Sequence, residues 1–163
     1  GHPAAGSAST PVRRGAAGGD GVAPWVSIPW RLAEAMIAHA RAEAPLEACG
    51  ILGGRGGQVL HFYPARNADR SPVRYTVHPE DQLRILLDME RQGVELWGIF
   101  HSHPHSEAYP SATDVRYAYY PEAYYVIASL AGRVPVLRAF RIVGGQITEY
   151  PVRFEDAPRS DGS

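Results

Sequence analysis

Lysine is missing from the sequence, cysteine occurs once, and no apolar run is long. The single cysteine, Cys49, excludes an intrachain disulfide, and no signal peptide pattern precedes the apolar part of the chain. We therefore expect a cytoplasmic protein. No apolar run approaches the roughly 18 residues that a membrane-spanning helix needs, so no membrane association is expected.

The chain also lacks an excess of charge of either sign. Its formal net charge is -1, and its 16 basic residues are all arginines scattered along the sequence. A broad basic field is the usual mark of a nucleic-acid-binding domain, so we expect no nucleic acid partner. We attribute the absence of lysine to a compositional bias, because composition alone carries no mechanism.

The composition that remains is that of one globular domain. Of the 163 residues, 45% are hydrophobic and 20% are charged, which is enough to form one core without disulfides. Residues 1–24 consist mainly of Gly, Ala, Ser and Pro, and we expect a disordered tail or linker there. The domain is expected over residues 25–154, followed by a second disordered tail over residues 155–163.

A first helix is predicted within residues 27–45. Ser27 can cap this helix, Pro29 lies near its first turn, and Pro45 ends it. The spacing of apolar residues predicts a buried face made of Leu32, Ala35, Met36 and Ala40.

Two apolar runs around a glycine cluster predict a β-hairpin over residues 47–65, and residues 73–77 predict another short strand. A second helix is predicted over residues 78–93, with His78 at its start and Gly93 as its stop. Its buried side is expected to consist of Leu83, Ile85, Leu86 and Met89.

Strands dominate the second half of the chain. Residues 95–104 predict a buried strand, and a short helix is expected to begin near Ser111. Further strands are predicted over residues 123–130, 135–142 and 146–154. Interleaved helices and strands followed by a run of strands favour a single α/β domain with a mixed, curled β-sheet flanked by helices.

Histidines gather where the buried strand ends. His101 and His103 are two residues apart, and side chains alternate along a strand, so both imidazoles project from the same side. Catalytic zinc typically takes three protein ligands, and Asp114 is the leading candidate for the third. Ser111 can aim its hydroxyl into the same pocket; the alternative is a plain helix N-cap with Asp114 in the first turn.

Other metal-binding patterns fit less well. Cupins also carry His-x-His followed by a glutamate, and Glu107 has that spacing, but Glu95 and Asp114 stand where cupins have glycines. The metallo-β-lactamase pattern requires an Asp-His pair, whereas Ser106 follows His105 here. The predicted helices also argue against an all-β barrel.

The complete set of residues resembles the JAMM (MPN+) family of zinc-dependent isopeptidases. That family has a glutamate well upstream of His-Ser/Thr-His-Pro, followed by Ser-x-x-Asp. Here Glu47 precedes "HSHP", the seven residues "PHSEAYP" separate His103 from Ser111, and "SATD" follows. The segments "EACGILGG" and "YTVHPED" are also similar, and the resemblance covers roughly residues 27–153.

The resemblance implies the MPN fold, which is cytidine-deaminase-like, and one zinc ion bound by His101, His103 and Asp114 together with a water molecule. It implies that Glu47 takes the proton of that water and later delivers it to the leaving amine. It also implies that Ser111 donates a hydrogen bond to the oxyanion.

Five other polar residues have no assigned role in catalysis. We expect Ser102 to support the site or to pack, and Cys49 to be a core residue rather than a nucleophile. His105 is expected at the rim of the pocket rather than as a fourth ligand. His39 and His61 are expected to be structural.

The function implied by the resemblance is hydrolysis of the peptide or isopeptide bond after the C-terminal Gly-Gly of a ubiquitin-like or sulfur-carrier protein. The bond would join the carrier to a lysine or to a free cysteine. The alternative is a non-catalytic MPN-type protein-binding module, against which the intact ligand set argues. A cupin-like metal oxygenase is the third hypothesis, weakened by the spacing differences above.

Overall fold

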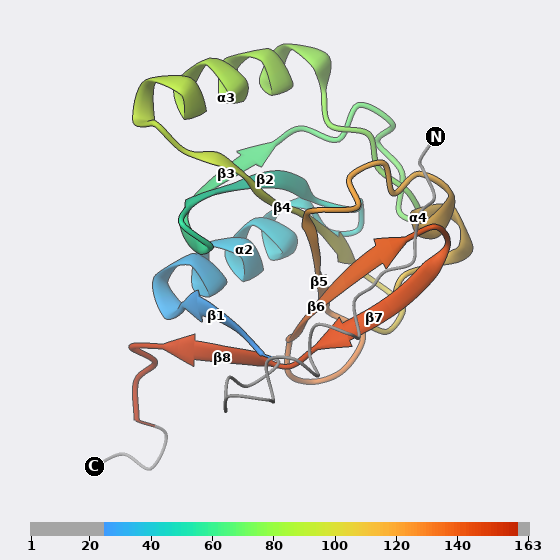
Figure 1. Ribbon diagram of the computed structural model, residues 1–163. Coiled ribbons are helices and arrows are strands. Elements are labelled where there is room, and N and C mark those ends of the chain that lie inside the picture. The colour runs from blue at the N-terminus through green and yellow to red at the C-terminus, as the bar shows by residue number, and fades with distance from the viewer. Residues whose placement is uncertain (1–24, 160–163) are drawn as a thin grey trace.

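A six-stranded mixed β-sheet forms the centre of the structure, a computed structural model that describes residues 25–159 (Figure 1). The strand order is β3-β2-β4-β5-β6-β7; β4 and β5 run parallel and all other neighbours are antiparallel. The strands are β2 (Cys49–Arg55), β3 (Gln58–Ala65), β4 (Glu95–His103), β5 (Tyr124–Ser129), β6 (Val136–Val143) and β7 (Gln146–Tyr150). The predicted mixed sheet is confirmed.

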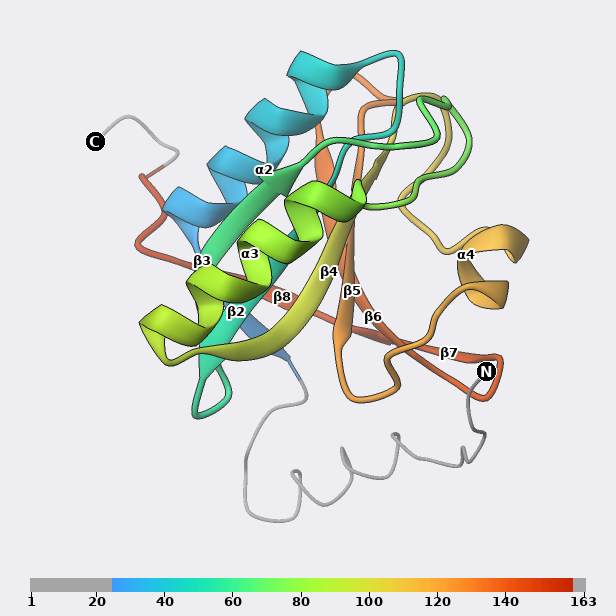
Figure 2. The same cartoon turned by 90° about the horizontal axis from the view of Figure 1, so that it is seen from above.

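Helices cover both faces of this sheet. Helix α2 (Trp30–Glu43) packs on one face and α3 (Pro79–Gln92) lies over the other, and the short α4 (Ala112–Arg116) belongs to the crossover between β4 and β5 (Figures 1 and 2). Strands β1 (Val26–Pro29) and β8 (Val152–Glu155) form a separate parallel pair beside α2. Within residues 25–159, no helix is long and apolar enough to cross a membrane.

Helix α2 contributes a stripe of small and aliphatic residues to the larger core cluster. Leu32, Met36 and Ala40 are buried as predicted, but Ala35 is exposed and Ala33 is buried in its place. Residues 32, 33, 36 and 40 lie within one third of the helical circumference, which residue 35 does not share. Ser27 was also wrong as the cap, because it lies in β1, and the helix starts after Pro29 without a side-chain cap.

Helix α3 begins and ends as predicted. The His78 ring accepts a hydrogen bond from the Glu80 N–H, and Gly93 ends the helix with a φ of 70°, which costs glycine little. Ile85 is buried as expected. The prediction that Leu83 and Leu86 are buried was wrong, because α3 rests on the sheet along a narrow row of residues spaced four apart: Asp81, Ile85 and Met89.

Two predicted strands take another form. Residues 73–77 form a loop with a single bridge, between Asn67 and Val77. The strand predicted over residues 146–154 is interrupted at Pro151, which has no N–H, so β7 pairs with β6 whereas β8 pairs with β1. The predicted tail 1–24 and residues 160–163 lie outside the described residues, and β8 continues to Glu155.

A buried carboxylate joins the end of β3 to the first turn of α3. Asp81 Oδ2 accepts hydrogen bonds from the Arg66 N–H at 2.8 Å and from Arg66 Nε at 3.0 Å, and Oδ1 accepts one from Nη2 at 3.0 Å. These bonds lower the pKa of Asp81 well below its usual range, although burial opposes the shift. The ionised carboxylate therefore holds the loop of residues 66–78 at both of its ends.

We predict that Asp81→Asn lowers the free energy of unfolding at neutral pH by about 1–3 kcal/mol, because charged hydrogen bonds are lost. The native pKa of Asp81 lies below the unfolded value, so this stability is present above that value and lost at lower pH. Urea unfolding at several pH values measures it, with exposed Glu90→Gln on the same helix as the control. If the difference in unfolding free energy between wild type and Asp81→Asn stayed unchanged down to about pH 3, this account would be contradicted.

Candidate metal centre

The register between β2 and β4 brings the candidate base to the candidate ligands. Cys49 pairs with His101 in this antiparallel ladder, so continuing it by two residues places Glu47 opposite His103. Glu47 Oε2 is 4.0 Å from His103 Nε2. Because side chains two apart share a face, Glu47, His101 and His103 all project from the face that carries α3.

The three predicted ligands converge on one point. His101 Nε2 and His103 Nε2 are 3.2 Å apart, and each lies 3.1 Å from Asp114 Oδ2. Ligand atoms bonded at about 2.0–2.1 Å in a tetrahedral site are separated by about 3.3 Å, so this triangle matches the base of such a site. All three side chains are buried, with exposed fractions of 1%, 4% and 6%.

Hydrogen bonding fixes the orientation of the His103 ring. His103 Nδ1 is 2.7 Å from the backbone oxygen of Glu107, a pure acceptor, so Nδ1 carries a hydrogen. Nε2 can therefore bind a metal ion once it gives up the proton that it shares with Asp114. The His101 ring is held instead by stacking on Tyr75, with ring centroids 4.5 Å apart. His101 Nδ1 is buried and has no hydrogen-bond partner among residues 25–159.

The charges of the ligands depend on one another. Burial opposes ionisation of Asp114, but the hydrogen bonds with His101 and His103 outweigh burial and lower its pKa. Burial lowers the pKa of His101. Burial also disfavours charged His103, yet its hydrogen bonds with Asp114 and Glu107 raise its pKa overall. A metal ion bound here would replace a proton shared by this cluster, which makes affinity fall at low pH.

Ser111 and Asp114 combine the two roles that the sequence left open. Ser111 Oγ accepts a hydrogen bond from the Asp114 N–H at 3.0 Å, and Asp114 Oδ2 accepts one from the Ser111 N–H at 2.9 Å. This capping box starts α4 and simultaneously aims Asp114 Oδ2 at the histidines. Because Ser111 Oγ acts as an acceptor here, its exposed hydroxyl hydrogen is available to another acceptor.

Glu47 is a buried carboxyl group with a free oxygen. Its side chain is 3% exposed, and Oε1 has no hydrogen-bond partner in the described part of the chain. Burial raises the pKa of Glu47 to about 8, with opposing effects from His103 and Asp114. The positive charge of a bound metal ion would favour the ionised form.

The neighbours of these residues behave largely as predicted. Ser102 is fully buried and its Oγ accepts a hydrogen bond from the Ala48 N–H at 2.7 Å, which ties the residue after Glu47 to the ligand strand. Burial raises the pKa of the Cys49 thiol to about 12, so Cys49 is a core residue. His39 Nε2 lies 3.1 Å from the Cys49 backbone oxygen, a structural contact. His105 is exposed.

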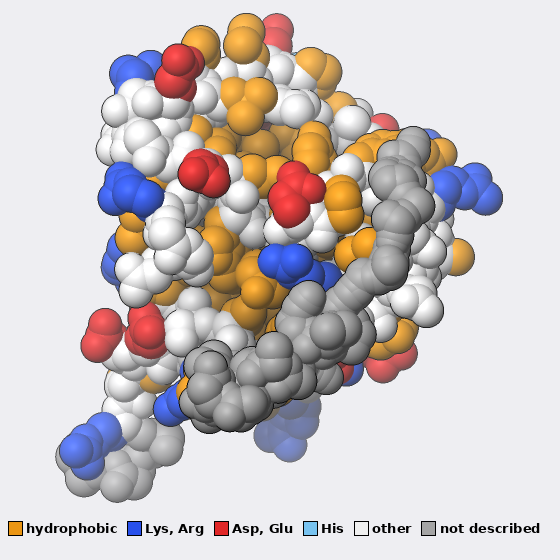
Figure 3. Space-filling view, in the orientation of Figure 1, with side chains coloured by type: hydrophobic (Ala, Val, Ile, Leu, Met, Phe, Trp, Pro, Cys, Tyr) orange, Lys and Arg blue, Asp and Glu red, His pale blue; other side chains and the backbone are white. Residues whose placement is uncertain are grey.

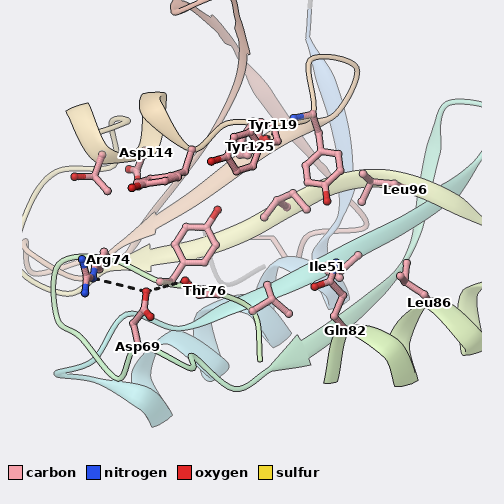
Figure 4. Close-up of a pocket in the computed structure, with 16 residues that line it drawn as sticks. Ile51, Asp69, Arg74, Thr76, Gln82, Leu86, Leu96, Asp114, Tyr119 and Tyr125 are labelled. Carbon is pink, nitrogen blue, oxygen red and sulfur yellow. Dashed lines mark hydrogen bonds and ion pairs between the residues drawn. The ribbon is translucent and has the colours of Figure 1, made fainter. Parts of the chain in front are cut away.

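A pocket of about 640 Å³ extends from the metal centre along the sheet. Figure 4 shows Asp114 at one end of the pocket and Leu86 and Leu96 at the other. Sequence reasoning missed its aromatic lining, because no local pattern indicates that these residues meet. The tyrosines that line it are Tyr75, Tyr117, Tyr119, Tyr120 and Tyr125.

Two imidazoles and one carboxylate form a donor set that catalytic zinc sites use. The preformed triangle, the fixed His103 tautomer and the unpaired oxygen of Glu47 fit a metal ion with one position open to water. His101, His103 and Asp114 therefore can bind a metal ion.

Comparisons with known proteins relate the chain to one protein family and to several named relatives. Residues 29–143 match the family described as prokaryotic homologs of the JAB domain. A CysO-cysteine peptidase from Mycobacterium tuberculosis is 44% identical over 126 residues, which cover 74% of this chain and 85% of the relative. A desampylase from Haloferax volcanii is 35% identical over 129 residues, which cover 75% of this chain and 91% of that relative.

Solved structures agree with the predicted fold. A protein from Desulfitobacterium hafniense, solved in solution, is 39% identical and superimposes with a TM-score of 0.74 over 81% of this chain and 94% of that chain. A JAB1/MPN domain protein from Archaeoglobus fulgidus is 16% identical, with a TM-score of 0.50 over 79% of this chain and 98% of that chain. The second likeness shows the fold alone, which is that of a JAB1/MPN domain.

We predict that Asp114→Ala lowers the zinc content of the purified protein, whereas Glu47→Gln leaves it at one ion per chain. The first change removes a ligand, and the second keeps the shape of a residue outside the ligand triangle. Elemental analysis after dialysis measures both. Zinc loss in Glu47→Gln would instead make Glu47 a ligand.

Removal of zinc from the wild type by a chelator should leave its far-UV circular dichroism unchanged, because the ligands lie at a strand end and the core does not depend on them.

Proposed function

The chain belongs to the family of prokaryotic homologs of the JAB domain, and we propose that it is a zinc-dependent hydrolase. Its substrate is a ubiquitin-like or sulfur-carrier protein, joined through its C-terminal Gly-Gly to a lysine side chain or to cysteine. The enzyme cleaves the bond after that Gly-Gly. The relatives named as a peptidase and a desampylase support hydrolysis over binding alone.

The observation that carries this proposal is the position of Glu47 beside the ligand triangle. Its Oε2 is 4.0 Å from His103 Nε2, and its Oε1 is buried without a partner among the described residues. Zinc, when bound, lowers the pKa of its water toward about 7 and polarises the scissile carbonyl. A structural metal site would have no need of a buried carboxylate with an unpaired oxygen beside its ligands.

Separate residues of this chain then carry out the proton transfers and stabilise the developing charge. Glu47 accepts the proton of the attacking water and delivers it to the leaving amine. Ser111 uses its free hydroxyl hydrogen to stabilise the oxyanion that develops on the scissile carbonyl. His101, His103 and Asp114 hold the metal, and Ser102 keeps the Glu47 segment attached to the strand that carries the histidines.

The pocket suits an extended peptide that ends at the metal centre. It runs from Asp114 to Leu86 and Leu96, so a tail lying along it reaches the ligands with its last residues (Figure 4). Paired glycines carry no side chains and can lie close to Tyr75, which stacks on His101, whereas the tyrosine-lined part can take apolar residues that precede them.

The folded body of the carrier would dock on the exposed face of α3. Leu83, Leu86 and Leu87 are 61%, 47% and 50% exposed, and Figure 3 shows hydrophobic side chains gathered over this helix. Leu86 also lines the pocket, so the leucine surface is continuous with the path of the tail. A carrier with an apolar patch beside its tail can therefore bind both at once.

The second candidate function is a protein-binding module without catalysis. Such a module needs no buried carboxylate beside three convergent ligand atoms, because burying these groups without a chemical purpose costs stability. The cytoplasmic location expected from the sequence stays a prediction.

We predict that Glu47→Gln lowers the cleavage rate about 10²- to 10⁴-fold, as expected when a general base is lost. A panel of Gly-Gly-ended carriers, each linked to lysine or cysteine, is incubated with the zinc-loaded protein, and intact mass reports the products. Glu47→Gln that retains zinc and full activity would remove Glu47 from the mechanism. Wild type that cleaves no conjugate but binds one would favour the binding module.

We also predict that the double variant Leu83→Gln/Leu87→Gln raises the KM for a carrier conjugate about five- to tenfold, because an apolar anchor is lost. Cleavage of a short peptide that carries only the Gly-Gly tail should not change. Val134→Thr, which alters an exposed apolar residue away from α3, serves as the control. An equal loss with both substrates would place the defect in the pocket rather than on a docking surface.

A further inference from the structure

One buried side chain organises the loop that connects β3 to α3. Residues 66–78 contain no helix or strand apart from the single bridge between Asn67 and Val77. Asn67 is only 6% exposed. The loop nevertheless forms one wall of the pocket, because Arg74, Tyr75 and Thr76 line it.

The carboxamide of Asn67 uses its full capacity for hydrogen bonds. Its Nδ2 donates to the backbone oxygens of Glu47 at 3.1 Å and of Arg74 at 3.0 Å, and shares a longer bond of 3.5 Å with that of Ser71. Its Oδ1 accepts from the backbone N–H groups of Asp69 at 2.9 Å and of Thr76 at 3.1 Å. A carboxamide has two donors and two acceptor positions, and these four bonds fill them all.

These four bonds connect the segment that carries the base with the segment that stacks on a ligand. One donation reaches the backbone of Glu47 itself, whose N–H is in turn bonded to the Ser71 oxygen at 2.8 Å. The bonds on the other side hold residues 74 and 76, which flank Tyr75. Tyr75 stacks on His101 at 4.5 Å. Asn67 therefore connects the Glu47 segment with Tyr75, the residue that stacks on the candidate ligand His101.

We propose that Asn67 is a positioning residue that holds Glu47 and Tyr75 in register with the metal ligands. The inference rests on the proposed role of Glu47 as the general base. Asn67 does not touch the ligand atoms and acts only through the two backbone segments that it joins.

The chemistry of the site explains why asparagine stands at this position. Aspartate has nearly the same shape but no donor, so its carboxylate would face the backbone oxygens of Glu47 and Arg74 and repel both. Alanine would leave the two carbonyl oxygens and the two N–H groups that Asn67 contacts without this partner. Asn67→Asp thus removes the two donations while keeping the acceptor that organises the loop.

The first test follows the anchoring without any activity measurement. Hydrogen exchange is compared between wild type, Asn67→Asp and Asn67→Ala, each loaded with zinc. In both variants we expect faster exchange of the Glu47 amide, with α2 and β6 unchanged and zinc content at the wild-type level. The Asp69 and Thr76 amides should exchange faster in Asn67→Ala, which removes their acceptor, than in Asn67→Asp, which keeps it. Unchanged exchange at Glu47, or loss of zinc, would overturn the proposal.

The second test asks whether Asn67 acts through Glu47. Asn67→Asp should lower kcat about 10- to 100-fold in the wild type, as loss of an outer support of a metal site does, but less than about threefold in the Glu47→Gln background. Ser71→Ala is the matched control, because it removes a side-chain bond to the Val73 N–H in the same loop and keeps the backbone bond to Glu47.

The outcomes separate this proposal from the proposed function. Equal losses of kcat in both backgrounds would show that Asn67 acts independently of Glu47 and would overturn the inference. A Ser71→Ala protein as impaired as Asn67→Asp would do the same, since any disturbance of the loop would then suffice. If the wild type cleaves no conjugate, the proposed function fails, and hydrogen exchange still decides whether Asn67 anchors the Glu47 segment.

Discussion

The antiparallel register between β2 and β4 is the constraint on which the site depends. It sets Cys49 opposite His101 and therefore Glu47 opposite His103, so the proposed base and two candidate ligands from distant parts of the sequence share one face. Two bonds between Ala48 and Ser102, at 2.7 and 3.0 Å, continue this register beyond the end of β2. A slip by one residue would turn Glu47 to the opposite face, toward α2.

Successive side chains of β4 point to opposite faces of the sheet, so one strand contributes both to the core and to the candidate site. Phe100 and Ser102 face the core that α2 covers, where Phe100 is fully buried. His101 and His103 face the other way, next to the apolar cluster beneath α3. The larger core therefore stabilises the sheet from behind, and the opposite face can hold buried polar groups whose desolvation is unfavourable. The candidate metal centre can be buried on this face because the core on the other face already stabilises the sheet.

The way α3 packs on the sheet determines the shape of the pocket and which leucines are exposed. The helix is buried only along Asp81, Ile85 and Met89, and Arg66 bonds to Asp81 at its first turn. Such a narrow contact leaves leucines on the outside and space beside the sheet for the pocket. The same geometry explains why amphipathic spacing predicted the helix but not which of its leucines are buried: the width of a contact depends on the partner surface.

The sequence by itself determined most helices and strands, the hairpin, and which residues gather in the candidate site, namely His101, His103, Ser111 and Asp114, because these depend on periodicity, turn residues and a spaced motif that are local. Glu47 came from the family resemblance, since a lone carboxylate before a strand has no local mark of function. Only the tertiary structure decided that Pro151 splits the last strand between two sheets, that residues 73–77 are a loop around Asn67, and that five tyrosines line one pocket. These features are contacts between segments far apart in the chain, and no local pattern of residues specifies which distant segments will meet.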